Sequence, residues 1–537
     1  MLYQKRISRR GFLAGAAATG GAAGLILIGC GGKSENAGLI TPTGAAGQPK
    51  KGGTIHFYTL APVLSLEPAS VQGSAYANLL YSYVVQATDW HTPNFMIGDL
   101  AESWETPDDV TWIFHLRDDA KFPDIAPTNG RTLVADDIVK SIDRLRTRPG
   151  MPPGWDEYTE KYEAVDARTW KETTKKPYGY FLYDLGGGAT GIVATDLAES
   201  YGDDLSSKVA GSGPYTVKSY SPNEGLEVVR NPLYYHDYPY VDGFNLKVFT
   251  DDAAAQAAFR GRQIDAYSPP TKPTADNLRS VSGASITRFL DQEWSVFVVN
   301  AVKFPQFKDE RIREAIDLSL NRQQMIDKLL FGDAELAGSV PPYWPAALPK
   351  EEIEAAYQRD VNKAKQLLTA ANASDLTFDL SFASYQDNPD RAAIIQSNLA
   401  DAGITVNLKS ADVGTWLDAL LKNDYVSTTY TQLRYGNDWM AVNWQHSCGW
   451  THSEANYTGV DDPEVDALID QINGTIDDQE RTKLEQDMQR KVLARHGPMF
   501  TLYQPYDYWA AYDYVKGYTP TSNGFGLYKY DYWIDKG

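Results

Sequence analysis

The stretch Trp294–Asp327 reads WSVFVVNAVKFPQFKDERIREAIDLSLNRQQMID, and the rest of the chain is organised around it. It opens with a run of strand formers and then turns at Pro305. A helix follows whose apolar residues recur every four positions, at Ile312, Ile316 and Leu320. Because a strand passes directly into a helix after a segment rich in Gly, Ser and Pro, we interpret this stretch as a crossing between two lobes.

Length and composition narrow the class of protein. A chain of 537 residues is too long for one core and indicates two or three domains. The formal net charge of -20 argues against nucleic acid as a partner, since phosphate binding requires a basic surface. The 34 Tyr and 13 Trp fit a protein that encloses small molecules, although a large core with an aromatic rim would also use them.

The first thirty residues have the features of an export address. Arg9 and Arg10 precede Gly11, Phe12 and Leu13 in a pattern that resembles the twin-arginine signal. The tetrapeptide 27–30, Leu-Ile-Gly-Cys, resembles a bacterial lipobox, so we expect a signal peptide over 1–29 and lipidation at Cys30. The alternative, a transmembrane helix, fits poorly because the stretch holds little Leu or Val before Leu25.

Local patterns predict alternating strands and helices. Strands are expected over 54–59, 110–116 and 215–220, and a helix over 75–86. Asp136 or Asp137 should cap a helix that carries Ile138 and Ile142, and Asp252 an Ala-rich helix that ends at Gly261. Such alternation is typical of α/β lobes.

Several blocks carry a family resemblance. LAESWE at 100–105, WIFHLRDDAKF at 112–122 and TLVADDIVKSIDRL at 132–145 resemble family 5 extracytoplasmic solute-binding proteins, the dipeptide, oligopeptide and nickel group that serves ABC importers. Further matches follow in the order that the family shows: 211–215, 230–235, 260–265, Asn300, 309–315 and 402–406.

The resemblance implies a two-lobed periplasmic-binding-protein-like α/β fold of type II, cluster C, with a subdomain inserted in the first lobe. It implies these boundaries: a linker at 30–53, a first lobe at 54–84, 209–290 and 505–537, an inserted subdomain at 85–208, and a second lobe at 291–504. A monomeric, extracytoplasmic and lipid-anchored protein without a cofactor is expected, with a small solute and an ABC permease as partners.

The ligand is expected at one aromatic segment, 430–457, which holds three Trp, two His and Cys448. By resemblance this segment lines the cleft of the second lobe, although a packed aromatic loop is the alternative. The candidate binding residues are Leu64, Ser65, Trp294, Arg434, Tyr435, Gly436, Asn437, Asp438, Trp439, Asn443, Trp444 and Tyr503.

This segment departs from the peptide-binding pattern. In peptide-binding members an Asp here pairs with the terminal amine of the peptide, whereas this chain places Met440 or Val442 at that position. Neither neutralises a buried ammonium group, which would cost several kcal/mol if left unpaired. Asp438 could substitute, but the departure favours neutral or polar ligands such as oligosaccharides, which stack on Trp and Tyr.

His446, Cys448 and His452 form a second candidate site, for a metal. Imidazole and thiolate bind Zn, Ni or Cu, and nickel transport occurs in the family that the chain resembles. The spacing is not that of a standard zinc site, and a fortuitous cluster is the alternative. Once Cys30 is acylated, Cys448 is the only thiol left, so no intramolecular disulfide forms.

Three classes of function remain. A receptor that captures a solute by lobe closure needs no chemistry, and we do not expect an enzyme. A secreted hydrolase would need a nucleophile with a base or facing carboxylates, and the sequence shows neither G-x-S-x-G nor His-Glu-x-x-His. A nickel or metal-chelate receptor and a periplasmic sensor or chaperone on the same fold are the alternatives.

Overall fold

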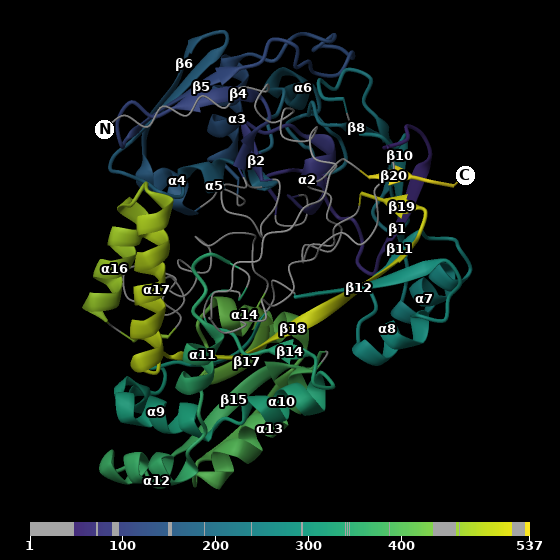
Figure 1. Ribbon diagram of the computed structural model, residues 1–537. Helices are drawn as coiled ribbons and strands as arrows, with labels where there is room; N and C mark the ends of the chain where they lie inside the picture. Colours follow the sequence, from purple (N-terminus) through teal and green to yellow (C-terminus); the bar gives the residue numbers. More distant parts are fainter. Residues whose placement is uncertain are drawn as a thin grey trace, which may run out of the picture.

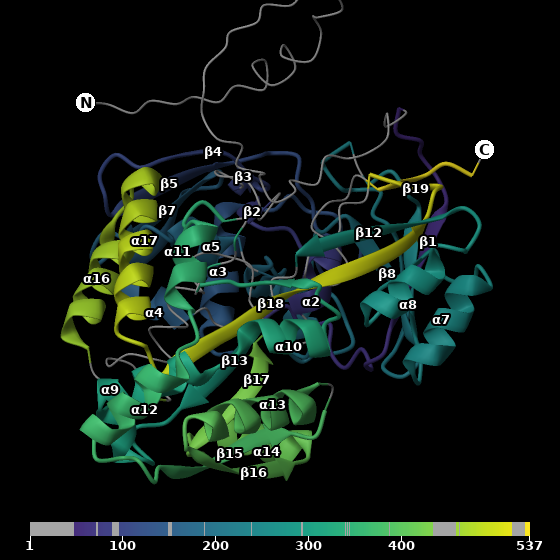
Figure 2. The same cartoon turned by 60° about the horizontal axis from the view of Figure 1, so that its bottom comes forward.

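The structure is a computed structural model. It describes residues 48–70, 74–87, 96–148, 153–186, 188–237, 239–290, 294–338, 340, 342, 344–385, 387–432, 458–460, 462–517 and 532–536. Its strands form three main sheets, with helices between and outside them (Figures 1 and 2). We refer to these as sheets I, II and III.

Sheet I has the strand order β1-β10-β9-β8. Its strands are β1 (Thr54–Thr59), β8 (Tyr215–Ser221), β9 (Gly225–Arg230) and β10 (Gly243–Val248). The expected strands at 54–59 and 215–220 are therefore present. The associated helices are α2 (Ser74–Leu80), α7 (Asp252–Arg260) and α8 (Lys272–Leu278). Asp251, one residue before the Asp predicted as cap of α7, accepts the hydrogen bond from the Ala254 amide at 2.8 Å.

Helix α2 is shorter than the predicted helix over 75–86. It ends at Leu80, because the loop at 211–213 packs against the chain at this point. The Gly213 amide donates to the Leu80 carbonyl at 3.1 Å, and a Cβ on Gly213 would lie 2.4 Å from the carbonyl carbon of Leu80. Only glycine permits so close a backbone approach, which explains the Gly-Ser-Gly sequence before β8.

Sheet II belongs to the segment expected as the inserted subdomain and has the order β4-β5-β7-β6. Its strands are β4 (Ala101–Glu105), β5 (Thr111–Leu116), β6 (Thr159–Asp166) and β7 (Thr169–Thr174). Strands β2 (Val85–Ala87) and β3 (Met96–Gly98) pair beside it. The helical elements are α3 (Ala135–Leu145), α4 (Pro153–Tyr158), α5 (Phe181–Leu185), η1 (Gly188–Thr190) and α6 (Thr195–Ser200).

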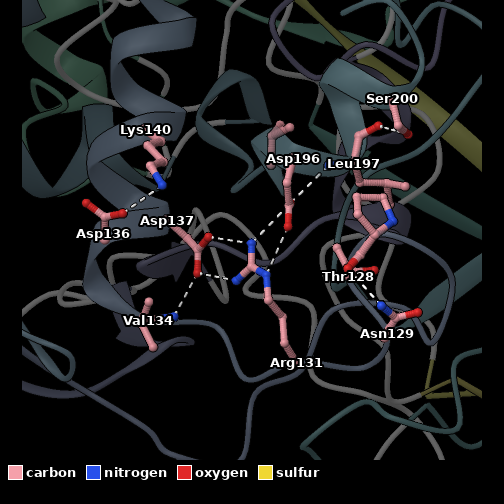
Figure 3. Close-up of polar contacts among 12 residues, drawn as sticks. Thr128, Asn129, Arg131, Val134, Asp136, Asp137, Lys140, Asp196, Leu197 and Ser200 are labelled. Atoms are coloured by element: carbon pink, nitrogen blue, oxygen red, sulfur yellow. Dashed lines mark hydrogen bonds and ion pairs between the residues drawn. The ribbon is translucent and has the colours of Figure 1, made fainter.

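The acidic pair at the start of α3 is held by cations (Figure 3). Val134 is the N-cap residue, and Asp137, at the third helical position, accepts from the Val134 amide at 2.9 Å. The Arg131 guanidinium binds Asp137 through two bonds of 2.8 Å and reaches Asp196 at 3.1 Å. Asp136 pairs with Lys140 at 2.8 Å. The prediction that Asp136 or Asp137 is the N-cap residue is therefore wrong, although both carboxylates lie in the first turn of the helix.

Sheet III has eight strands, with the order β11-β18-β13-β17-β15-β16 and with β12 and β14 also paired to β18. Its strands are β11 (Ala266–Tyr267), β12 (Ala284–Leu290), β13 (Trp294–Val299), β14 (Ala334–Glu335), β15 (Thr377–Ala383), β16 (Thr405–Ala411), β17 (Ser427–Gln432) and β18 (Met499–Tyr512). The two-stranded ribbon β19 (Val515–Lys516) with β20 (Trp533–Ile534) follows β18.

The helical elements that follow β13 are η2 (Pro305–Lys308), α9 (Glu310–Ser319), α10 (Arg322–Leu329), α11 (Lys350–Ala356), α12 (Val361–Ala370), α13 (Asn388–Asp401), α14 (Val413–Leu421), α16 (Pro463–Gly474) and α17 (Asp478–Ala494). The stretch Trp294–Asp327 is thus a strand followed by helices, as its pattern predicted. Asp309 caps α9, whose apolar stripe is buried, and Leu320 ends it before Asn321 caps α10.

Strand β18 crosses between the parts of sheet III. Its residues up to Tyr503 pair with β13, and its residues from Tyr506 onward pair with β12. The chain crosses a second time between β12, which ends at Leu290, and β13, which begins at Trp294. In proteins whose domains close, hinges are formed by a few loop or element-terminal residues. The division of the chain at the expected lobe boundaries stays a prediction.

Candidate solute-binding site

The candidate site lies at one edge of sheet III. Strands β15 and β16 are parallel, β15 and β17 are parallel, and β13 is antiparallel to β17. The carboxyl ends of β15, β16 and β17 therefore lie at the same edge as the start of β13. Ligands of open α/β sheets bind outside the carboxyl ends of the strands. The chain leaves β17 at this edge and enters the segment 433–457, where the sequence predicts most ligand contacts.

A buried arginine supports this edge. Arg391 lies in the first turn of α13, which follows β15, and its side chain is 0% exposed. The guanidinium donates hydrogen bonds to Ser295 Oγ (2.8 Å), Asp387 Oδ2 (3.0 Å), Thr429 Oγ1 (3.1 Å), Tyr503 Oη (3.1 Å), Thr431 Oγ1 (3.2 Å) and Asn388 Oδ1. One side chain thus joins β13, β17, β18 and α13 at this edge of sheet III.

Burial and neighbouring charges shift the pKa of two members of this network, Arg391 and Tyr503. Burial opposes the positive charge of Arg391, but Tyr503 and Asp387 outweigh it and raise its pKa. Burial also raises the pKa of Tyr503, whose hydroxyl donates to Asp387 Oδ2 at 3.0 Å. The network therefore contains an Arg–Asp ion pair and a neutral Tyr. Because the guanidinium is saturated by protein acceptors, we assign Arg391 to supporting the site and not to holding a solute carboxylate.

Two of the predicted site residues lie near this edge, on the neighbouring strands β13 and β18. Trp294 begins β13 and is 1% exposed, in an apolar cluster with Val296, Val298, Tyr425 and Tyr430. Tyr503 lies on the neighbouring strand β18, opposite Ser295. Both side chains are buried, but on opposite faces of sheet III, because Tyr503 shares Arg391 with Ser295, the neighbour of Trp294 on β13. Direct contact of either with a solute stays a prediction.

Two other predicted residues lie elsewhere, in the turn that follows β1 of sheet I. Leu64 is 53% exposed, and Ser65 accepts a hydrogen bond on its hydroxyl from the Glu67 amide at 3.1 Å. The turn is held by backbone bonds to Pro222 and Ser206. An exposed Leu beside a bonded Ser is compatible with a ligand-facing turn, and the assignment stays a prediction.

The remaining predictions concern residues outside the described part of the chain. They are Arg9, Arg10, Cys30, Arg434, Tyr435, Gly436, Asn437, Asp438, Trp439, Asn443, Trp444, His446, Cys448 and His452. Within the described residues, no group of three or more His, Cys, Asp or Glu side chains is arranged to hold a metal ion. The helices of that same part include none with the length and apolar character needed to span a membrane.

The burial of Arg391 was not predicted, although the sequence contains a pattern that indicates it. Ile395, Leu399 and Ala402 form the buried stripe of α13, and Arg391 precedes Ile395 by one helical turn. A charged residue on the apolar stripe of a helix must find partners inside the protein. The hydroxyl-rich sequence of β17, Ser-Thr-Thr-Tyr-Thr-Gln, supplies two of those partners.

Comparison with known proteins identifies the family. Residues 96–453 match the bacterial extracellular solute-binding proteins, family 5 middle region. The probable D,D-dipeptide-binding periplasmic protein DdpA of Escherichia coli is 26% identical over 406 residues, which cover 74% of this chain and 77% of DdpA. The glutathione-binding protein GsiB of Salmonella typhi is 25% identical over 424 residues, covering 75% of this chain and 79% of GsiB.

A solved structure confirms the fold class. The periplasmic binding protein DppA of Helicobacter pylori, in complex with the peptide STSA, superimposes with a TM-score of 0.76 at 22% identity. The match covers 91% of this chain and 99% of DppA. The chain therefore has the two-lobed α/β fold of periplasmic binding proteins, and it belongs to family 5 of the bacterial extracellular solute-binding proteins.

Proposed function

We propose that this protein is the solute receptor of an ABC importer and that it captures a peptide-like solute between two closing lobes. The family match over residues 96–453 carries the proposal. In this proposal the two crossings of sheet III would act as the hinge, and the carboxyl edge beside Arg391 would form part of the binding surface. Cys30, once lipidated, would anchor the receptor to the external face of the membrane that holds its permease.

The solute class rests on the relatives. DdpA and GsiB are named for a dipeptide and for glutathione, which is itself a peptide. An oligosaccharide is the second candidate, because Met440 or Val442 replaces the acid that peptide-binding members use, and because the segment 430–457 is rich in Trp. For a peptide, Asp438 would have to supply the carboxylate that holds the terminal amine.

Thermal unfolding of the exported protein tests the proposal. Di- and tripeptides, glutathione and short oligosaccharides would be added in separate series, and the free energy of unfolding measured at each concentration. A solute at a hundredfold excess over its Kd stabilises the protein by about 2.7 kcal/mol. Stabilisation by peptides and not by sugars is expected, and Asp438→Asn should remove it. Stabilisation by sugars alone would establish the second candidate, and no stabilisation in any series would contradict both.

A further inference from the structure

Apart from the two crossings of sheet III, the segment that follows sheet II contacts helices α16 and α17, which lie far from it in sequence. Helices α16 and α17 stand beside α4 and α5 in both views, whereas β12 and β18 cross elsewhere, toward the middle and right of the molecule (Figures 1 and 2). The Gly179 amide donates to the Asn473 carbonyl at 2.8 Å. The segment 177–184, which follows sheet II, therefore rests against the end of α16 and the start of α17. We refer to this as the side contact.

The interior of the side contact includes buried polar and charged groups among apolar ones. The Tyr180 hydroxyl donates to the Glu485 carboxylate, and the Arg481 guanidinium lies 4.8 Å from the centre of the Tyr180 ring. Arg481 also approaches Glu485 at 3.9 Å, with side-chain exposures of 5% and 2%. Burial raises the pKa of Glu485, although the bond from Tyr180 and the charge of Arg481 oppose the rise.

Tyr180 belongs to one part of the molecule, and Arg481 and Glu485 belong to the other. Their burial therefore depends on the two parts being together. A permanent interface is usually apolar, whereas interfaces between domains that move are more polar. Charged groups regain hydration when such parts separate, which keeps the free-energy cost of opening small. The chemistry of the side contact suits repeated opening and closing.

Gly179 shows how closely the parts meet. A Cβ at this position would lie 2.1 Å from the Thr475 carbonyl oxygen and 3.0 Å from Arg481 Nη1. The nearest atoms to that Cβ all belong to the α16–α17 side, so glycine is required by the contact itself. Gly474 offers a comparison in the same place, because a Cβ there would lie 4.0 Å from the Pro177 carbonyl oxygen, at ordinary contact distance.

We propose that the side contact is a latch that forms when the lobes close and separates when they open about the two crossings of sheet III. The inference rests on the proposed function, because a latch of this kind sets how long a captured solute is held. Gly179 lets the surfaces meet, and the Tyr180–Glu485 bond with the stacked Arg481 fastens them. None of these residues needs to touch the solute.

Gly179→Ala tests the latch, with Gly474→Ala as the matched control. Hydrogen exchange would be measured in the segments 177–184 and 473–485 of the exported protein, and X-ray scattering would give its radius of gyration. Gly179→Ala should expose both segments together, with exchange about tenfold faster, equivalent to about 1.4 kcal/mol. Its radius of gyration should rise, while Gly474→Ala should match the natural protein. Exchange in sheet I should stay unchanged in both variants.

A second variant keeps the side contact free of added bulk. Tyr180→Phe removes only the hydroxyl that reaches Glu485, whereas Tyr178→Phe removes a hydroxyl that bonds Asp184 within its own part, at 2.7 Å. Faster exchange in 473–485 is expected for Tyr180→Phe alone. Unchanged exchange in both Gly179→Ala and Tyr180→Phe would overturn the latch. Changes in exchange as large in the control variants, Gly474→Ala and Tyr178→Phe, would also overturn it.

These measurements need no solute, so they separate the latch from the proposed function. Repeating the scattering with a mixture of di- and tripeptides adds the link between them. The solute-free natural protein is expected to populate both open and closed states, so peptides should compact it further, and they should compact Gly179→Ala less. Opening of Gly179→Ala without any response to peptides in the natural protein would support the latch and contradict the peptide receptor.

Discussion

Glu172 makes the stability of this protein depend on pH in a defined direction. Its side chain is 0% exposed, on the same buried face of β7 as Trp170. One carboxyl oxygen accepts from the Thr159 hydroxyl at 2.5 Å, and the other, Oε2, has no hydrogen-bond partner within the described residues. Burial, opposed by the Thr159 bond, raises the pKa of Glu172 from 4.5 to about 8. The folded protein therefore holds a proton that the unfolded chain releases.

The sign and size follow from proton linkage. Because the folded state binds the extra proton, the free energy of unfolding is highest below the unfolded pKa of 4.5 and falls as pH rises to about 8. One pKa unit corresponds to about 1.4 kcal/mol, so the loss from this group is at most about 5 kcal/mol. Burial also raises the pKa of Asp184 to about 7, which adds a loss of the same sign.

Glu172→Gln is the perturbation, since the amide keeps the shape and stays neutral at every pH. Urea unfolding followed by circular dichroism would be measured at about pH 5 and about pH 9. Near pH 5 the variant should match the natural protein, and near pH 9 it should be more stable by up to about 5 kcal/mol. Glu163→Gln is the control, because that carboxylate on β6 is 40% exposed and pairs with Lys161 at 2.7 Å. Equal destabilisation by Glu172→Gln at both pH values would refute the reasoning.

Other predictions concern the site and the export address. Arg391→Lys should lower the free energy of unfolding by about 3 kcal/mol, because one ammonium group cannot satisfy the acceptors that surround the guanidinium; an unchanged urea midpoint would contradict its supporting role. Trp439→Ala combined with Trp444→Ala should abolish solute binding and leave the melting temperature of the solute-free protein nearly unchanged, as calorimetry would show; unaltered affinity would exclude this cleft assignment. Arg9→Lys with Arg10→Lys should retain the precursor inside the cell, and normal export, seen by fractionation, would contradict the twin-arginine interpretation.

Elements set by neighbouring residues could be predicted well. The strand β13 and the helix α9 were predicted from a run of strand formers and a four-residue apolar repeat. Both patterns depend only on residues close together in sequence. The predicted helix over 75–86 was too long, because the loop at Gly213, far away in sequence, ends it at Leu80. The family could be identified from ordered motifs, whereas the solute could not, because this chain departs from the pattern at Met440 or Val442.

By itself, the sequence determined most strands and helices and the family, because each is written in residues that lie close together along the chain, and the export address stays a prediction. The tertiary structure alone decided which polar residues become buried. Arg391 meets acceptors on three strands, and Tyr180 meets Glu485 across 305 positions of sequence. Such pairings depend on how whole elements pack, since the free energy of a buried charge is set by every group around it.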